Sequence, residues 1–336
     1  MSPMNTDIKK IAIVRLSALG DIINSAIVLQ FIKEHYPQIE IDWITEEVFS
    51  PLLEHHPLIK RLHTINLKEL KKKRTFSLLK INIQKLRHLG AYDLVIDMQG
   101  LLKSAIVSRI ISPNTHGFDR ESTRESLAAL FYKNSSHISY EKSVIKRNTF
   151  LVADALGFEI SEAMILQKQA LFPIKKTFEL QEEKKNITFV IGASWKSKIY
   201  PKELVVKVCD ALQESIYIIW GSEDEKKEAE WIVQNSHHAS LAPQCNLSEL
   251  ISFVSAMDLL IGNDTGPTHI AWVQNIPSIT LFGPTNARMM YETPKNRAIE
   301  SNSEVNILKI NKNDFSIKDI DYKEIVIQAK ELLYGL

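Results

Sequence analysis

The sequence predicts an α/β protein of two domains, each built on a parallel β-sheet with helices on both faces. Short runs of β-branched and apolar residues alternate with helical patterns along most of the chain, as is typical of parallel sheets. The chain has 336 residues, more than one hydrophobic core usually supports, so two domains of about 150 residues are expected. The alternation restarts near residue 187 after a polar stretch, which predicts domains at 1–175 and 187–320.

The first half contains short apolar runs separated by helical segments. The strands are predicted at Ile11–Leu16, Ile39–Ile44, Arg61–Ile65 and Leu94–Met98, and the helices at 21–35, 67–88 and 101–111. The alternation of these strands with helices implies a parallel sheet with helices on both faces.

The second half repeats this organisation. The strands are predicted at Ile187–Ile191, Tyr217–Trp220, Leu259–Ile261 and Ser278–Phe282, and the helices at 201–214, 223–236, 247–256 and 266–274. The remaining segment, 321–336, contains a last helix at 321–334, and packing on either domain, the N-terminal one included, stays open. Glycines follow several of these strands, at the sheet edge where open α/β sheets bind ligands. We expect two such edges to face each other across one cleft.

Composition excludes several classes of protein. The net charge is +1, so no global charge attracts nucleic acid, and the two cysteines suggest neither a disulfide framework nor a zinc site. No run of eighteen apolar residues is present, and the N-terminal apolar run is too short for a signal peptide, so a cytoplasmic protein is expected. The glycine fingerprints of dehydrogenases and P-loop enzymes are missing.

The strongest local signal is IGNDTGPTHIAW, residues 261–272, where a strand ends and a helix opens with Pro at its first position. The amides around Thr265, Gly266 and Thr268 are then expected to be free at the helix N-terminus. Free amides at such a position bind anions, and a pyrophosphate suits them.

Two side chains flank that helix start. Asp264 can accept hydrogen bonds from sugar hydroxyls, and His269 can donate to a phosphate oxygen. The alternative is structural: Asp264 and Thr265 are helix caps, and His269 is a histidine satisfied within the fold.

A second segment, GASWKSKIYPKE at 192–203, also joins a predicted strand to a helix. It carries Ser194, Lys196 and Lys198, and a lysine there supplies a compact positive charge for phosphate. A solvated lysine loop is the alternative.

A third segment, LSALGDIINS at 16–25, places Asp21 at the start of a helix just after Gly20. Asp21 is either an N-cap or a general base that takes a proton from a hydroxyl nucleophile.

Two further segments carry cations. Arg120 and Arg124 lie in GFDRESTRESLAALFY, residues 117–132, and can bind carboxylates or phosphates, or form surface ion pairs of little energetic value. The stretch 67–90 holds eight Lys or Arg, and it is either a solvated helix face or a surface that docks on an anionic membrane.

Taken together, these segments resemble the lipopolysaccharide heptosyltransferases of glycosyltransferase family 9. The resemblance lies in LSALGD, DMQGLLKSA (97–105), RESLAALFY, K-x-Y-P-x-E (198–203) and NDTGPTH, in the same order and spacing, over nearly the whole chain. It is greatest to the type I branch of the family, chiefly through residues 117–132. The resemblance implies the GT-B fold, in which two Rossmann-like domains face each other.

The resemblance also implies the reaction. The donor is ADP-L-glycero-β-D-manno-heptose, and the acceptor is a Kdo sugar on Kdo-lipid A at the inner face of the inner membrane. Transfer inverts the anomeric centre and uses neither a metal nor another cofactor. The N-terminal domain binds the acceptor and the C-terminal domain the donor, with peripheral contact to an anionic membrane surface and no nucleic acid partner.

The site residues follow from the family's motifs. By resemblance Asp21 is the catalytic base, Glu225 binds the ribose, and Arg120 and Arg124 hold the Kdo carboxylate or lipid phosphates. The other donor-binding residues are Ser194, Lys198, Asp264, Thr265, Gly266 and His269. The alternatives are a type II enzyme or another transferase of this fold, a sugar-nucleotide epimerase, and a non-catalytic nucleotide-sugar binding protein.

Overall fold

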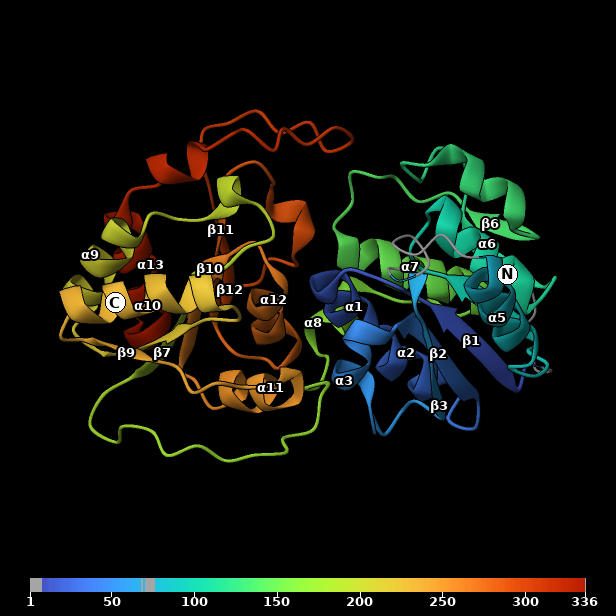
Figure 1. The fold of residues 1–336 in the computed structure, drawn as a ribbon, viewed down its shortest axis with the longest axis horizontal. Coiled ribbons are helices and arrows are strands. Elements are labelled where there is room, and N and C mark those ends of the chain that lie inside the picture. The colour runs from blue at the N-terminus through green and yellow to red at the C-terminus, as the bar shows by residue number, and fades with distance from the viewer. Residues whose placement is uncertain (1–7, 68, 70–75, 336) are drawn as a thin grey trace. The chain divides into compact units, whose positions relative to one another are not determined.

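The computed structural model describes residues 8–67, 69 and 76–335. The chain divides into two compact units, Met1–Lys168 and Gln169–Leu336, and each contains a six-stranded parallel sheet (Figure 1). The two sheets and their covering helices confirm the predicted fold class.

The first unit has the strand order β3-β2-β1-β4-β5-β6. Its strands are β1 (Lys10–Val14), β2 (Glu40–Glu46), β3 (Arg61–Ile65), β4 (Leu94–Asp97), β5 (Thr115–Phe118) and β6 (Asn134–Ser136). Its helices are α1 (Leu19–Ala26), α2 (Val28–His35), α3 (Ser50–Leu53), α5 (Phe76–Arg87), α6 (Leu102–Ile111), α7 (Val144–Leu156) and α8 (Glu162–Leu166), with 3-10 turns η1 (Glu47–Phe49) and η2 (Ser126–Phe131).

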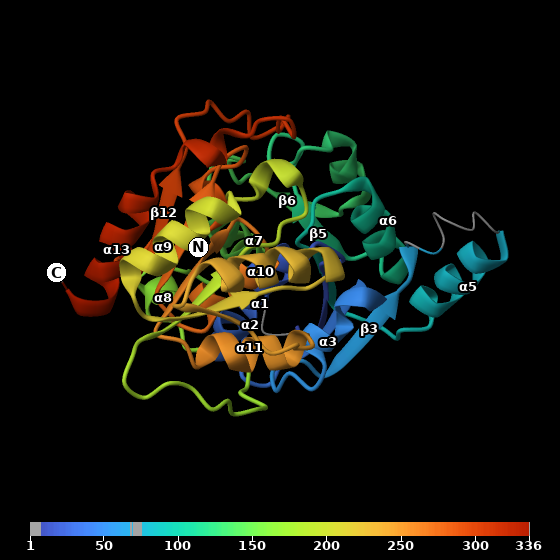
Figure 2. The same cartoon turned by 60° about the vertical axis from the view of Figure 1, so that its left-hand side comes forward.

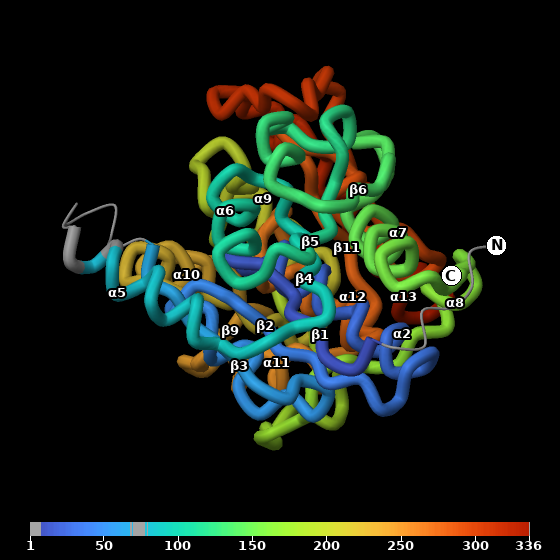
Figure 3. Tube along the Cα trace, turned by 90° about the vertical axis from the view of Figure 1, so that its right-hand side faces the viewer, coloured from blue at the N-terminus to red at the C-terminus, as the bar shows by residue number. Residues whose placement is uncertain are grey.

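Helices cover both faces of this sheet because its central strands are apolar on both sides. Ala12 and Val14 of β1 share a core cluster with Leu86 of α5, which packs beside α6, so these two residues face α5 and α6. Ile11 and Ile13 are also buried and point to the opposite face, because side chains alternate along a strand. Helices α1 and α2 pack against α7, and Figure 3 shows α2 and α7 across the sheet from α5 and α6.

The second unit has the order β12-β11-β10-β7-β8-β9. Its strands are β7 (Asn186–Val190), β8 (Ser215–Ile219), β9 (Ala239–Leu241), β10 (Leu259–Asn263), β11 (Ser278–Phe282) and β12 (Asn296–Glu300). Its helices are α9 (Lys202–Leu212), α10 (Glu223–Asn235), α11 (Leu247–Ser255), α12 (Gly266–Val273) and α13 (Tyr322–Tyr334), with 3-10 turns η3 (Lys196–Lys198), η4 (Ala287–Met289) and η5 (Ser316–Asp319).

The last helix, α13, belongs to the core of the second unit. Ile325 and Ala329 are fully buried in the cluster that also contains Val205 of α9 and Phe189 of β7. The sequence left packing on the N-terminal domain open; the apolar stripe of α13 instead lies against α9.

Both sheets have the doubly wound order, in which the third strand from one edge is the first in sequence. Strand order therefore reverses between β1 and β4 in one unit and between β7 and β10 in the other. Ligands of open α/β sheets bind outside the carboxyl ends of the strands at this switch point. A ligand site is therefore expected in the segments that follow these four strands.

Several elements differ from the sequence prediction. The predicted helix 21–35 is two helices, which meet at Ile27. Strands β5, β6, β9 and β12 and helix α7 were not predicted. Part of the predicted helix 67–88, with five of the eight cations of the basic stretch, lies outside the described residues. Among the helices that the structure describes, none is long and apolar enough to cross a membrane.

Candidate functional site

At the switch point of the second unit, Asn263 fixes the loop after β7 to the end of β10. Its side-chain amide donates to the carbonyl of Ile191 at 2.8 Å, and its side-chain oxygen accepts from the Tyr200 amide at 3.1 Å. Asn263 is fully buried, so these bonds hold the two loops in register at the sheet edge.

Asp264 is the centre of a buried polar cluster at this edge. Lys198 Nζ donates to the Asp264 carboxylate at 2.5 Å and to the main-chain carbonyl of Asp264 at 3.1 Å. Thr285 donates its hydroxyl to the same carboxylate oxygen at 2.7 Å, and His269 Nε2 lies 3.2 Å from the other oxygen. Asp264 is 3% exposed and Lys198 8%, so this ion pair is largely shielded from water.

The charges of this cluster support one another. Burial alone opposes ionisation of Asp264, but the neighbouring Lys198 and His269 outweigh it and hold the pKa of this carboxyl well below its usual range. A carboxylate has room for about four hydrogen bonds, so the three side-chain donors leave one position for a hydroxyl. The structure therefore uses Asp264 mainly to anchor Lys198, and not as a helix cap.

Helix α12 begins directly after this aspartate. Thr265 is its N-cap residue, Gly266 is its first residue and Pro267 its second, one position later than the sequence predicts. The Thr268 amide, expected to be free, instead donates to the Thr265 carbonyl at 3.1 Å, because the first turn tightens. The Thr268 hydroxyl donates to Asn263 at 2.6 Å. The Thr265 and Gly266 amides thus remain the candidates for anion binding at this N-terminus.

The loop after β7 brings Lys198 to the cluster and leaves Ser194 and Lys196 exposed. Lys198 ends the short turn η3, and its ammonium lies 5.0 Å from the centre of the Trp195 ring. The two lysines of this loop therefore have different roles: Lys198 is built into the site, whereas Lys196 is a solvated surface residue.

Glu225 lies at the start of α10, where the ends of β7 and β8 come together. Its carboxylate accepts from the Gly221 amide at 2.7 Å. A Cβ on Gly192 would lie 2.3 Å from this carboxylate, so a larger residue there would displace the Glu225 side chain. Glu225 is half-buried at the same edge of the sheet as Lys198.

In the first unit, Asp21 lies just beyond β1. It is the third residue of α1, and Ala18, not Asp21, is the N-cap. The Asp21 carboxylate accepts from the Ala18 amide at 3.2 Å and lies 3.0 Å from Arg15 Nη2. The Asp21 side chain keeps 30% of its surface exposed, so it can reach a ligand while Arg15 holds its orientation.

The turn after β4 supports this loop from the neighbouring strand. Gln99 accepts from the Leu16 amide at 2.9 Å and donates to the Ser17 hydroxyl at 3.3 Å. Asp97 is fully buried and accepts from the Tyr132 hydroxyl at 2.7 Å. Burial raises the pKa of Asp97 although its hydrogen bonds oppose this. These contacts are structural: they fix the turn that carries Gln99.

Arg120 and Arg124 are both exposed in the segment between β5 and η2. The segment is tied to the turn after β4, because the Thr123 hydroxyl donates to the Gly100 carbonyl and Glu125 accepts from the Leu102 amide at 2.8 Å. The two arginines thus lie near the edge that carries Asp21, and they are available to an anionic ligand.

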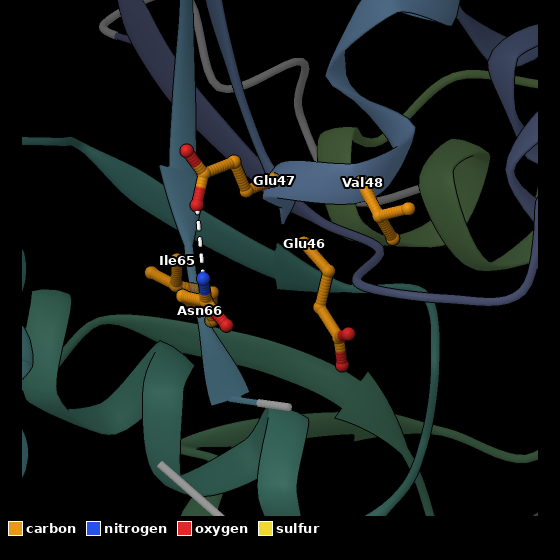
Figure 4. A pocket seen from close by; sticks show the side chains of 5 residues that line it. All are labelled: Glu46, Glu47, Val48, Ile65 and Asn66. Carbon is orange, nitrogen blue, oxygen red and sulfur yellow. Dashed lines mark hydrogen bonds between the residues drawn. The ribbon is translucent and has the colours of Figure 1, made fainter. Parts of the chain in front are cut away.

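A cavity of about 290 Å³ lies at the ends of β2 and β3 (Figure 4). It is lined by Glu46, Glu47, Val48, Ile65 and Asn66. Glu47 accepts from the Asn66 amide group at 3.0 Å, and Lys103 lies 3.5 Å from Glu46 and 3.0 Å from the Ser17 hydroxyl. The cavity therefore adjoins the loop that carries Asp21.

Two partners in these clusters were missed by sequence reasoning. Thr285 follows β11 and Tyr132 follows η2. The hydroxyl of each donates to an aspartate at the carboxyl end of a different strand. Thr285 lies outside the motifs read from the sequence, and Tyr132 ends the segment 117–132 but was given no role there. Over the described residues, no group of three or more His, Cys, Asp or Glu side chains is arranged to hold a metal ion.

Comparison with known proteins places this geometry in a family. A family model described as glycosyltransferase family 9 (heptosyltransferase) matches residues 82–320. Lipopolysaccharide heptosyltransferase 1 of Campylobacter coli is 38% identical, over 96% of this chain and 98% of that protein. The protein of the same name from Escherichia coli K12 is 26% identical, over 90% of this chain and 96% of that protein.

Solved structures show the same two-domain fold. The E. coli heptosyltransferase WaaC with ADP-2-deoxy-2-fluoro heptose has a TM-score of 0.78 at 22% identity, covering 96% of this chain and 99% of that one. E. coli ADP-heptose lps heptosyltransferase II has a TM-score of 0.68 at 20% identity, over 97% of this chain and 99% of that one. The predicted GT-B fold is confirmed. The chain is a glycosyltransferase and belongs to glycosyltransferase family 9, the heptosyltransferase family.

Proposed function

We propose that this enzyme transfers L-glycero-D-manno-heptose from ADP-heptose to the Kdo of Kdo-lipid A in synthesis of the lipopolysaccharide inner core. The observation that carries the proposal is the Lys198–Asp264 pair at the start of α12, on the switch point of the second sheet. Family membership supports it, as does the 38% identity to a lipopolysaccharide heptosyltransferase 1.

The donor diphosphate binds against Lys198 and the amides of Thr265 and Gly266. A WaaC structure holds an ADP-heptose analogue, and this chain has the WaaC fold. Lys198 is preorganised because Asp264 and its carbonyl hold the ammonium in place. Such a fixed charge stabilises the leaving diphosphate as its negative charge grows in the transition state.

Other donor contacts follow from the same sheet edge. Glu225 binds the ribose hydroxyls, and the exposed Ser194 hydroxyl reaches a phosphate oxygen. The remaining hydrogen-bonding position of Asp264 takes a heptose hydroxyl. His269 Nε2 is engaged by Asp264, so His269 acts on the donor mainly by fixing this carboxylate.

Chemistry requires one proton transfer and one displacement. The acceptor hydroxyl oxygen bonds to the anomeric carbon from the side opposite the diphosphate, and the bond to the ADP oxygen breaks with its electron pair. The hydroxyl proton passes to Asp21, and the configuration inverts. Arg15 orients the Asp21 carboxylate, and Lys198 with the α12 amides carries the charge of ADP, so no metal is needed.

The acceptor is anionic, and the exposed Arg120 and Arg124 bind its Kdo carboxylate or lipid phosphates. A lipid acceptor also implies that the enzyme works at the inner face of the inner membrane, as a peripheral protein on an anionic surface.

The alternatives make different products. A type II enzyme requires an acceptor that already carries heptose, and an epimerase converts the donor when no acceptor is present. A non-catalytic protein binds the donor and leaves it intact. No observation in this chain favours any of them over the type I reaction.

The test is a transfer assay with ADP-heptose and Kdo-lipid A, followed by mass spectrometry of the lipid and NMR of the new anomeric centre. One added heptose with inverted configuration is expected. Transfer only to heptose-bearing acceptors would replace the type I assignment with type II, and donor turnover without transfer would replace it with an epimerase.

A further inference from the structure

One side of the first unit exposes apolar side chains on three adjacent elements: α5, α6 and η2. We call these side chains the apolar face. They are Ile81 (54% exposed), Leu102 (36%), Ile106 (39%), Leu127 (60%) and Leu130 (61%). Contiguous exposed apolar surface on a folded chain usually marks an interaction site.

These side chains come from elements that contact one another. Leu102 and Ile106 are one helical turn apart on α6, and Leu127 and Leu130 are three apart on η2, where such residues eclipse. Helix α6 contacts both α5 and η2, and Figure 2 shows α5 and α6 side by side.

The charged side chains of α5 and α6 are all positive. Helices α5 and α6 carry Lys80, Lys85, Arg87, Lys103 and Arg109, and their sequences contain no Asp or Glu. Lys80, Arg87 and Arg109 are exposed.

Two carboxylates next to η2, Glu121 and Glu125, lie near this face and are outnumbered by the five cations of α5 and α6. Glu125 accepts from the first turn of α6, through the Leu102 amide. Glu121 lies near His137, at 3.8 Å. Apolar side chains next to helices that carry cations and no carboxylates are complementary to a bilayer with anionic headgroups.

The position of this face agrees with a lipid-borne acceptor. Helix α6 begins two residues after Gly100, and Lys103 in its first turn bonds Ser17 in the loop that carries Asp21. The apolar face thus extends from the edge of the sheet where the acceptor is proposed to react.

We infer that the α5–α6–η2 face docks on the surface of an anionic lipid bilayer, with the apolar side chains in the interface and the cations on lipid phosphates. The biological role of this docking rests on the proposed function, but binding of the face to a bilayer can be measured without any transfer reaction. It assigns membrane contact to α6 and η2 as well as to α5.

Vesicle cosedimentation tests this with the full chain. Vesicles of phosphatidylcholine mixed with phosphatidylglycerol are compared with vesicles of phosphatidylcholine alone, at low and high salt. The double variant L127S/L130S should lower the partition coefficient about tenfold or more. The double variant K80Q/R109Q should lower it about 30-fold on anionic vesicles, since each cation contributes about one kcal/mol.

Matched control variants come from the second unit. Leu308 and Ile327 are exposed to 55% and 58%, so L308S/I327S removes similar apolar area elsewhere. K323Q/K330Q removes two exposed lysines of α13. Neither control should change vesicle binding.

Three results would overturn the inference: no binding of the unaltered protein to anionic vesicles, equal losses in the control variants, or a self-associated protein that L127S/L130S dissociates. Transfer to a deacylated, water-soluble acceptor separates this from the proposed function. L127S/L130S should retain that activity. Vesicle binding without any transfer by the unaltered protein would refute the function and leave the docking face standing.

Discussion

Replacing Lys198 with methionine tests the buried cluster at the start of α12. The change keeps most of the length of the side chain and removes its charge, which leaves Asp264 buried with His269 and Thr285 as its side-chain partners. Removing one partner of a buried ion pair costs about 3–5 kcal/mol. For a unit of this size the melting temperature should fall by about 6–20 °C.

The same substitution should weaken nucleotide binding. A hydrogen bond to a charged group contributes roughly 1.5–3 kcal/mol, so the Kd for ADP should rise roughly 10- to 150-fold. Differential scanning calorimetry measures the first effect and isothermal titration calorimetry the second. Lys196→Met is the matched control, because Lys196 is exposed in the same loop, and its effect on stability should stay within about 0.5 kcal/mol.

A double variant separates stability from binding. In Lys198→Met/Asp264→Leu the uncompensated carboxylate is gone, so part of the lost stability should return, while ADP affinity stays low. The reasoning is refuted if Lys198→Met melts like the unaltered protein and binds ADP as tightly as Lys196→Met does.

Four further predictions concern the base, the metal, pH and the cysteines. Asp21→Asn keeps an acceptor for the Ala18 amide but loses the base, so transfer should fall at least about 100-fold with ADP-heptose affinity unchanged; normal turnover would remove Asp21 from this role. EDTA should leave transfer intact, and complete loss restored by a divalent ion would contradict the metal-free mechanism. Because the pKa of Asp264 is lowered on folding, its contribution to stability is complete above the unfolded pKa of about 3.9 and is lost as pH falls toward the folded value; urea unfolding below about pH 4 should therefore show a shallower pH slope in Asp264→Asn, and equal slopes would reject this. Iodoacetamide should modify the half-buried Cys245 before the fully buried Cys209, whose pKa burial raises to about 12, and equal rates in the native protein would contradict the described burial.

Sequence patterns predicted the central strands because their burial on both faces demands uninterrupted apolar residues. Strands β6 and β12 were not predicted, because their sequences NSS and NRAIE, at the sheet edges, contain too few apolar residues to be recognised as strands. Helix α7 had readable signals: Ser143 caps its start, accepting from the Lys146 amide, and Gly157 ends it at φ 76°.

The site was predictable where its residues follow strands at a switch point, as Lys198 and Asp264 do. Their direct pairing was not, because it depends on how the loop after β7 turns back through η3. Thr268 and His269 also differ from the prediction. The Thr268 amide bonds within the tight first turn of α12, and the His269 ring faces Asp264. These outcomes depend on local geometry that residue spacing does not encode.

The most direct test of the account is a crystal structure of this chain with bound ADP. We predict that the diphosphate lies within hydrogen-bonding distance of Lys198 Nζ and of the Thr265 and Gly266 amides, with the ribose at Glu225. A nucleotide bound away from the Asp264–His269 turn would contradict the proposed mechanism.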